Sequence, residues 1–234
     1  MKRCNRAAIA IAAFIVLAFN AGAIEEAKQK DAVGEPTAEG KASPKGEAIY
    51  QPPRRGAPRE RVGGGVRGGL QVPEPTALVP DHVGFTSQGS PSLFWQIDRP
   101  PDSDVRVFFA LIDLRSRKTI VETELERPAK AGIQRLRLSN LGVILQVGVE
   151  YEWSIALVSD MDRRSHDWVT TGYLERVADA DPAPRGAGEL AGAGLWYDAL
   201  EELSNRVDAQ PKDPLRLAQR NALLLQVGLE APAP

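Results

Sequence analysis

Six short segments between residues 92 and 177 alternate apolar and polar residues, and this alternation constrains the fold of the chain most strongly. The clearest case is 149–158, where every second residue is apolar: Val149, Tyr151, Trp153, Ile155 and Leu157. A period of two is typical of a β-strand with one buried face. We expect the other strands at 93–97, 105–113, 119–125, 132–138 and 168–177. Short strands separated by turn residues predict a mostly β fold, an antiparallel β-sandwich over residues 92–178.

Two of these segments allow sharper predictions. The segment 105–113 is apolar on both faces, which indicates a central strand of a sheet. In 132–138, the alternation predicts inward-pointing leucines (Leu136, Leu138) and outward-pointing arginines (Arg135, Arg137).

A sequence motif at the start of the clearest strand indicates which type of β-sandwich the chain forms. Leu145, Gly148 and Tyr151 form a Leu-x-x-Gly-x-x-Tyr sequence. It resembles the tyrosine corner of fibronectin type III and immunoglobulin-like domains, in which the phenol bonds to nearby backbone. Trp95 and Trp153 are the candidate core tryptophans, because large aromatic side chains dominate core burial.

The first 23 residues have the layout of a secretory signal peptide. Three basic residues precede an apolar run at 7–19, and the small residues Ala21–Ala23 follow it. The run is shorter than the ~20 residues that a transmembrane helix needs. Removing 1–23 takes away the single cysteine and leaves 26 basic against 31 acidic residues. An exported chain without disulfides fits a bacterial periplasm or cell surface.

Residues 24–91 contain little that could form a core of their own. The segment 24–48 is rich in Glu, Lys, Ala, Gly and Pro, which predicts a disordered spacer. The segment 49–91 is an irregular arm that we expect to wrap the sandwich, because its prolines exclude helix and central strand. Edge strands are expected within it at 78–79 and near 84–86.

The C-terminal region is predicted to be a loop at 179–192 followed by two helices within 193–229. In the first helix, apolar residues recur every four positions from Leu195 to Val207, with Trp196 widening the stripe. Asp213 and Pro214 form a start signal for the second helix. Gly228 suits a left-handed position at its end, so the two helices predict an αα-hairpin.

The arm carries a cluster of positive charge: Arg54, Arg55, Arg59, Arg61 and Arg67. These guanidinium groups and the neighbouring glycines could bind an anionic envelope polymer or carbohydrate, aided by exposed aromatics such as Trp168 and Trp196. Alternatively, the arginines pair with carboxylates of the acidic sandwich and the arm is a clamp. Nucleic acid is a poor ligand here, because export separates the protein from it.

The sequence offers few groups for catalysis. Residues 63–68 match G-x-G-x-x-G, but prolines flank them and no acidic residue follows at the required distance. The only histidines are His82 and His166, and an unrecognised hydrolase would need a concave site around one of them. A calcium site at Asp160, Asp162 and Asp167 is opposed by adjacent arginines. We expect neither a cofactor nor a metal, and no catalytic residue.

The order of several motifs resembles the bacterial family called domain of unknown function 928. The matching segments are 53–58, 61–68, 76–80, 82–86, 91–95, 147–153, 172–177, 194–200 and 224–229. Members with cysteines near the ends of the Gly-rich stretch and of the Tyr/Trp strand would form a disulfide there. This chain has Leu70 and Val158–Ser159 at those places, so the resemblance implies no disulfide.

The family implies no activity. We expect a non-catalytic protein-binding or scaffold module of the bacterial envelope, with a protein partner and no membrane contact after signal cleavage. Tyr151, Gly148, Trp153, Trp95 and Trp196 are expected to serve structure.

Overall fold

The computed structural model describes residues 48–53, 63–64, 72–180 and 183–230, all within one compact unit, Ser43–Pro234. The strands are β1 (Gly63–Gly64), β2 (Thr76–Ala77), β3 (Gly84–Thr86), β4 (Ser92–Ile97), β5 (Arg106–Asp113), β6 (Lys118–Leu125), β7 (Gly132–Arg137), β8 (Glu150–Val158) and β9 (Trp168–Arg176). The helices are α1 (Gly186–Gly192), α2 (Trp196–Ala209) and α3 (Pro214–Leu225), with short 3₁₀ turns η1 (Leu138–Leu141) and η2 (Arg164–His166).

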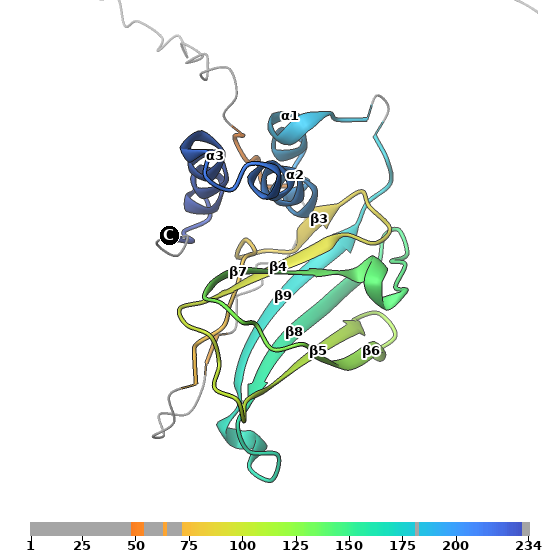
Figure 1. Ribbon diagram of the computed structural model, residues 1–234. Coiled ribbons are helices and arrows are strands. Elements are labelled where there is room, and N and C mark those ends of the chain that lie inside the picture. The colour runs from red at the N-terminus through yellow and green to blue at the C-terminus, as the bar shows by residue number, and fades with distance from the viewer. Residues whose placement is uncertain (1–47, 54–62, 65–71, 181–182, 231–234) are drawn as a thin grey trace, which may run out of the picture. The chain divides into compact units, whose positions relative to one another are not determined.

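The strands form two facing sheets, which confirms the predicted sandwich (Figure 1). The larger sheet has the order β1-β9-β8-β5-β6, with β3 pairing β9 in parallel, and the smaller has the order β2-β4-β7. This is the strand arrangement of immunoglobulin-like and fibronectin type III domains. Strand β5 lies between β6 and β8, as its two apolar faces predicted.

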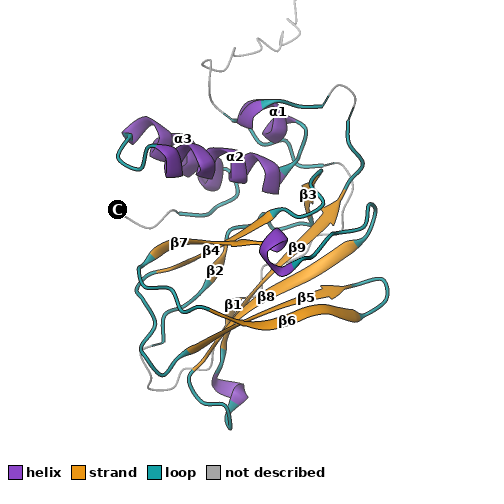
Figure 2. Cartoon of the chain, turned by 45° about the vertical axis from the view of Figure 1, so that its right-hand side comes forward, coloured by secondary structure: helices purple, strands orange, loops and turns teal. Residues whose placement is uncertain are grey.

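The three helices gather at one end of the sandwich, over the smaller sheet (Figures 1 and 2). Directly opposite residues of paired strands share a face, so Leu93, Trp95 and Ile97 of β4 point into the sandwich while Ser92 and Phe94 point toward the helices. Both faces of β4 are therefore buried.

Helix α2 docks on the sandwich through hydrogen bonds of its first two aromatic residues. The Trp196 Nε1–H donates to Leu78 O at 2.9 Å, and the Trp153 Nε1–H donates to Tyr197 Oη at 3.0 Å. The Tyr197 hydroxyl in turn donates to Tyr173 O at 2.9 Å. Because Trp153 reaches α2 across β9, the sandwich core and the helical layer share one set of aromatic side chains.

The predicted tyrosine corner is present at the entry to β8. The Gln146 N–H donates to Tyr151 Oη at 3.0 Å, so the phenol holds the loop five residues before it. Gly148 has a φ of 72°, a left-handed conformation that glycine adopts without strain.

The predicted helical hairpin at the C-terminal end of the described chain is present. The αα-hairpin of α2 and α3 is confirmed, with the Asp213 side chain accepting from Leu215 N at 2.9 Å. At the end of α3, Gly228 N–H bonds to Leu225 O and Leu229 N–H bonds to Leu224 O, the two bonds of a Schellman motif.

The predicted loop 179–192 is wrong in its second half, because α1 forms there. Ala187 and Ala191 are 3% and 0% exposed, and helix α1 packs against α2. Glycine-rich sequence has weak helix propensity, so this helix depends on tertiary packing that no local pattern reveals.

The predicted outward orientation of Arg135 is confirmed, but the pattern of β7 did not reveal what covers that face. Its side chain points away from the sandwich interior as expected, but it is only 11% exposed because the helical layer covers that face. The guanidinium lies 4.9 Å above the Phe94 ring and pairs with Asp208 of α2 at 3.1 Å.

Candidate functional site

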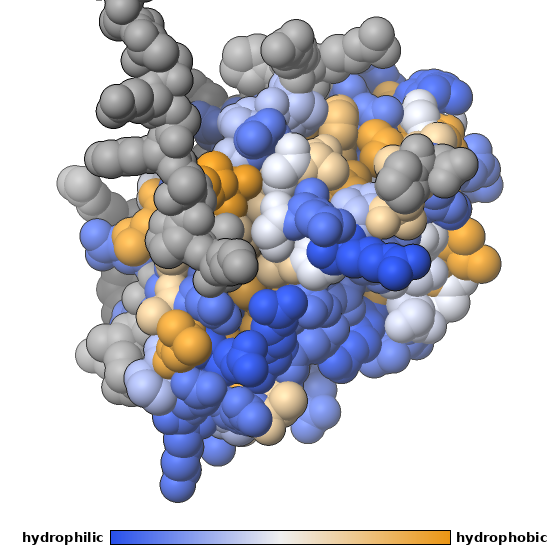
Figure 3. Space-filling model, turned by 90° about the horizontal axis from the view of Figure 1, so that it is seen from above, coloured by the Kyte–Doolittle hydropathy of each residue, from blue (hydrophilic) through white to orange (hydrophobic). Residues whose placement is uncertain are grey.

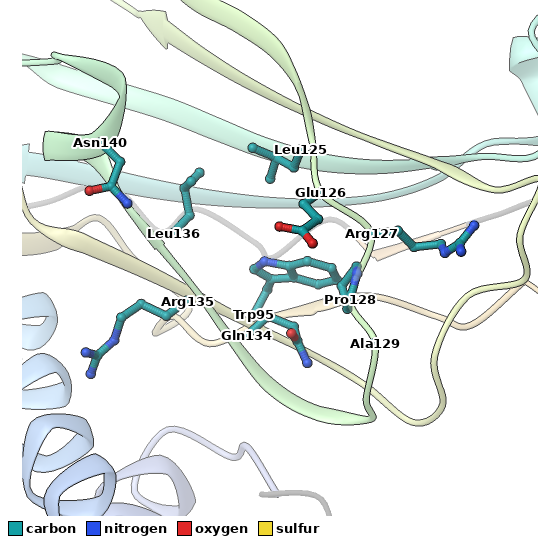
Figure 4. Close-up of a pocket in the computed structure, with 10 residues that line it drawn as sticks. All are labelled: Trp95, Leu125, Glu126, Arg127, Pro128, Ala129, Gln134, Arg135, Leu136 and Asn140. Atoms are coloured by element: carbon teal, nitrogen blue, oxygen red, sulfur yellow. The ribbon is translucent and has the colours of Figure 1, made fainter.

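A groove of about 440 Å³ opens between the two sheets, at the edge where β6 and β7 lie (Figure 4). Its walls come from the end of β6, the connection 126–129, and β7. Its floor is Trp95 of β4, with Leu125 and Leu136 beside the indole. The groove therefore combines an aromatic floor and two leucines with polar and charged lining residues: Glu126, Arg127, Gln134, Arg135 and Asn140.

Trp95 is buried as the sequence predicted, at 3% exposure. Its indole N–H nevertheless has no hydrogen-bond partner among the described residues, unlike those of Trp153 and Trp196. The Trp95 Nε1 atom is not among the buried side-chain atoms that lack a partner in the described residues, so the indole N–H is accessible from the groove. The groove thus contains an unused donor beside an apolar floor.

Both strands beside the groove are sheet edges within the described part of the chain. There β7 pairs with β4 alone, and β6 pairs with β5 alone. An edge strand presents main-chain N–H and C=O groups that can pair with another strand. Strand β7 spans six residues, long enough to seat an extended peptide.

The rim of the groove carries charges of both signs. Glu126 and Arg127 extend from the connection between β6 and β7, and Figure 4 shows them above and beside the indole. The Arg127 Nη1 donates to Asp102 O at 3.1 Å, which fixes that side chain on the rim. Polar groups around an apolar floor are the usual anatomy of a peptide-binding interface.

The helical face offers a less suitable surface. Seen from above, its apolar residues form small separate groups among hydrophilic ones (Figure 3). Leu215 and Leu225 of α3 are 61% and 60% exposed, whereas Leu223 and Leu224 are buried. Scattered exposed leucines of this kind are ordinary on protein surfaces.

The arginines proposed for anion binding, at positions 54, 55, 59, 61 and 67, lie outside the described residues. The described parts of the arm are anchored at several places. Gly63 and Gly64 pair with β9, so these glycines lie in a strand rather than in a turn between strand and helix. Upstream, Gln51 N–H bonds to Ala191 O at 3.0 Å, which ties the arm to α1. The arm therefore contacts the helices as well as the sandwich.

Tyr50 anchors the start of the arm in a second cavity, of about 600 Å³. Its hydroxyl lies 2.9 Å from His82 Nε2, and His82 Nδ1 lies 3.4 Å from Asp81 Oδ1. Gln226 Oε1 accepts from Tyr50 N at 2.8 Å. His82 thus lines a concave site, but its Nε2 is engaged by a buried tyrosine, an arrangement that holds the arm in place.

Two buried tyrosines predict a loss of stability at alkaline pH. Burial raises the pKa of both Tyr50 and Tyr197 above the ordinary tyrosine value of about 10. Their stabilising contribution is therefore fully present below about pH 10 and is lost as the pH rises through the folded-state values. We expect the urea midpoint to fall steeply above pH 10, and the Tyr50→Phe variant to show a shallower fall. Equal slopes for the two proteins would contradict this assignment.

The aromatic pair expected to bind carbohydrate is not exposed as a pair. Trp196 is 0% exposed, so its predicted role as an exposed aromatic is wrong, because it faces Leu78 and Tyr50. Its structural role is supported by the same contacts. Trp168 is half-buried against the core. The arginine-based alternative therefore lacks one of its two named aromatic contacts.

The acidic loop before β9 is held by its own arginines. Arg163 lies 3.8 Å from Asp160, and Arg164 pairs with Asp167. Asp160 also accepts from Asp162 N at 2.9 Å. These contacts support the expectation that the arginines oppose a calcium site.

Sequence reasoning missed two residues that the fold brings into buried polar contacts, Tyr50 and Asp198, and one that it leaves half-buried without a partner among the described residues, Arg220. Asp198 is an acidic residue among the apolar residues of the first turn of α2, and that position was a usable signal. Tyr50 and Arg220 carry no such signal, because the residues around them, Gln226 for Tyr50 and Arg135 for Arg220, are distant in sequence.

None of the helices in the described part of the chain is long and apolar enough to cross a membrane. Comparison with curated proteins gives no match. A comparison with protein families gives a match that covers both the sandwich and the helices. Residues 62–234 match the Domain of Unknown Function (DUF928), and the chain belongs to this family.

Proposed function

We propose that this chain is a non-catalytic protein-binding module of the bacterial cell envelope, and that it docks an extended segment of a partner protein in the groove above Trp95. The observation that carries the proposal is the accessible Trp95 indole N–H, which has no hydrogen-bond partner among the described residues and lies on the floor of a groove beside the unpaired edge of β7.

An extended peptide fits this groove chemically. Along one edge it presents main-chain groups that can pair with β7, and its carbonyl oxygens can accept from the Trp95 indole. Its alternate side chains would contact Leu125 and Leu136, because successive side chains of a strand point to opposite faces. Glu126 and Arg127 would meet opposite charges at the rim, which favours specificity over raw affinity.

The envelope location rests on the sequence of residues 1–23, which has the basic, apolar and small-residue regions of a signal peptide. The absence of cysteine after residue 4 agrees with a protein that does not rely on disulfides. Fusion of residues 1–23 to a periplasmic reporter enzyme tests this part. Activity of the reporter only in the cytoplasm would contradict export.

The docking proposal is tested with peptides selected on the full chain from a random display library. Trp95→Phe keeps an aromatic ring and removes the N–H donor, so we expect about a five-fold loss of peptide affinity, which corresponds to ~1 kcal/mol for one hydrogen bond. Trp168→Phe is the matched control, since Trp168 does not line the groove.

Backbone amide shifts locate the peptide independently of affinity. We expect shifts in β7 and in the Trp95 indole signal, and loss of binding when the central peptide amides are N-methylated. Shifts confined to another face, or equal affinities for both variants, would remove the proposal.

A further inference from the structure

Arg220 of α3 carries an unpaired charge in a half-buried position. Within the described part of the chain it forms no hydrogen bond and no ion pair, and its Nε atom is buried without a partner. Burial lowers the pKa of Arg220, and the positive charge of Arg135 lowers it further against the effect of Asp208. Burying a guanidinium group without an anion costs free energy, so a bound anion beside Arg220 would stabilise the folded protein.

Arg135 of β7 presents a second unused donor to the same layer. Figure 4 shows its side chain directed away from the groove, toward the helices. Its Nη1 donates to Asn205 Oδ1 at 2.9 Å and pairs with Asp208 at 3.1 Å, whereas its Nη2 is buried without a partner. Burial lowers the pKa of Arg135 as well.

The hydroxyl of Ser204 adds a neutral donor. Ser204 is 2% exposed, and its Oγ has no partner within the described residues. It precedes Asn205 and lies one turn before Asp208 on α2, next to the two residues that Arg135 contacts. Buried polar groups without partners require a bound species such as water or an ion.

The charges around this layer do not balance. Arg137 and Arg220 add to the positive charge near Arg135, and Asp208 and Glu201 oppose it. Glu201 already accepts from Ser92 and Gln88, and Asp208 is 62% exposed. Asp208, an exposed carboxylate, therefore pairs with the buried Arg135 and leaves the half-buried Arg220 without an ion pair among the described residues.

We propose that the layer between α2, α3 and β7 is an oxyanion-binding site, in which Arg220, Arg135 and Ser204 donate to a phosphate, sulfate or carboxylate group. Guanidinium groups recognise such oxygens in planar, charge-assisted hydrogen bonds. Arg135 also lines the groove, whereas Arg220 and Ser204 do not, so variants of Arg220 and Ser204 test this site separately from the proposed docking function.

Thermal unfolding of the full chain tests the site with three probes at matched ionic strength: inorganic phosphate, sulfate and acetate. An anion that binds the folded state raises Tm, and we expect a rise of about 3 °C or more at saturation for the wild type. A larger rise with acetate would assign the site to a carboxylate group, and a larger rise with phosphate or sulfate to an inorganic anion.

Arg220→Gln gives a signature that a merely structural arginine would not produce. Without oxyanions we expect this variant to unfold at a higher temperature than the wild type, because an unpaired buried charge is gone. At saturating anion the order reverses. Arg216→Gln is the matched control, since Arg216 lies on the same helix and pairs with Asp213 at 3.6 Å.

Ser204→Ala supplies a second variant that removes one donor and leaves both arginines. It should keep the fold and bind the anion several-fold more weakly. Equal anion-dependent shifts in the wild type, Arg220→Gln and Ser204→Ala, or no shift with any of the three probes, would overturn the proposal.

Discussion

Gly172→Ala is expected to destabilise the protein by about 3 kcal/mol, with a fall in Tm of roughly 6–12 °C. A Cβ atom at this position would lie 2.6 Å from the Trp153 indole, far inside van der Waals contact. The indole cannot move aside easily, because it is rigid, 0% exposed and bonded to Tyr197 at 3.0 Å. The clash therefore outweighs the ~0.5–1 kcal/mol that alanine gains over glycine in backbone entropy.

Thermal and urea unfolding measure this effect, and Gly192→Ala is the matched control. A Cβ at Gly192 would meet nothing within 4 Å, so that variant should be neutral or slightly more stable. Combining Gly172→Ala with Trp153→Phe should recover part of the lost stability, because the smaller phenyl ring leaves room for the new Cβ atom beside residue 172. A Gly172→Ala variant as stable as Gly192→Ala would show that the indole does not occupy this position.

Asp198→Asn is expected to destabilise the protein by about 2–4 kcal/mol and to weaken the attachment of α2. The carboxylate is 3% exposed and accepts from Thr86 Oγ1 at 2.5 Å, and from Ser87 N at 2.9 Å and Oγ at 2.6 Å. An asparagine has no charge and keeps only one acceptor oxygen for these three donors, so the charge-assisted hydrogen bonds of the buried carboxylate are lost. Burial raises the pKa of Asp198, and the hydrogen bonds from Ser87 and Thr86 oppose that effect.

Glu202→Gln is the control for this variant, because Glu202 pairs with Arg206 on the outer part of the same helix. Exposed ion pairs of this kind contribute about 0–1 kcal/mol. Urea unfolding followed by tryptophan fluorescence compares the two, with Trp196 and Trp153 both at the α2 contact. Similar midpoints for Asp198→Asn and Glu202→Gln would show that the buried carboxylate contributes little.

The strands were predictable because one of their faces is apolar. In β8 the residues predicted to face inward, from Tyr151 to Leu157, are buried at 3% exposure or less. Prediction was weaker where a second layer covers the outer face. Arg135 was expected outside and is nearly buried, because the helices that cover it come about 60–70 residues later in the chain.

The sequence alone determined the sandwich, the tyrosine corner at Tyr151, the caps of α3 and the family, because period-two alternation and capping signals act over a few residues. The tertiary structure alone decided helix α1, the docking of α2 on Trp153, the open groove above Trp95 and the unpaired Arg220. Each of these depends on which distant residue covers a side chain or leaves its donor without a partner. Burial by residues that are distant in the sequence depends on how the layers pack, so local sequence patterns do not predict it.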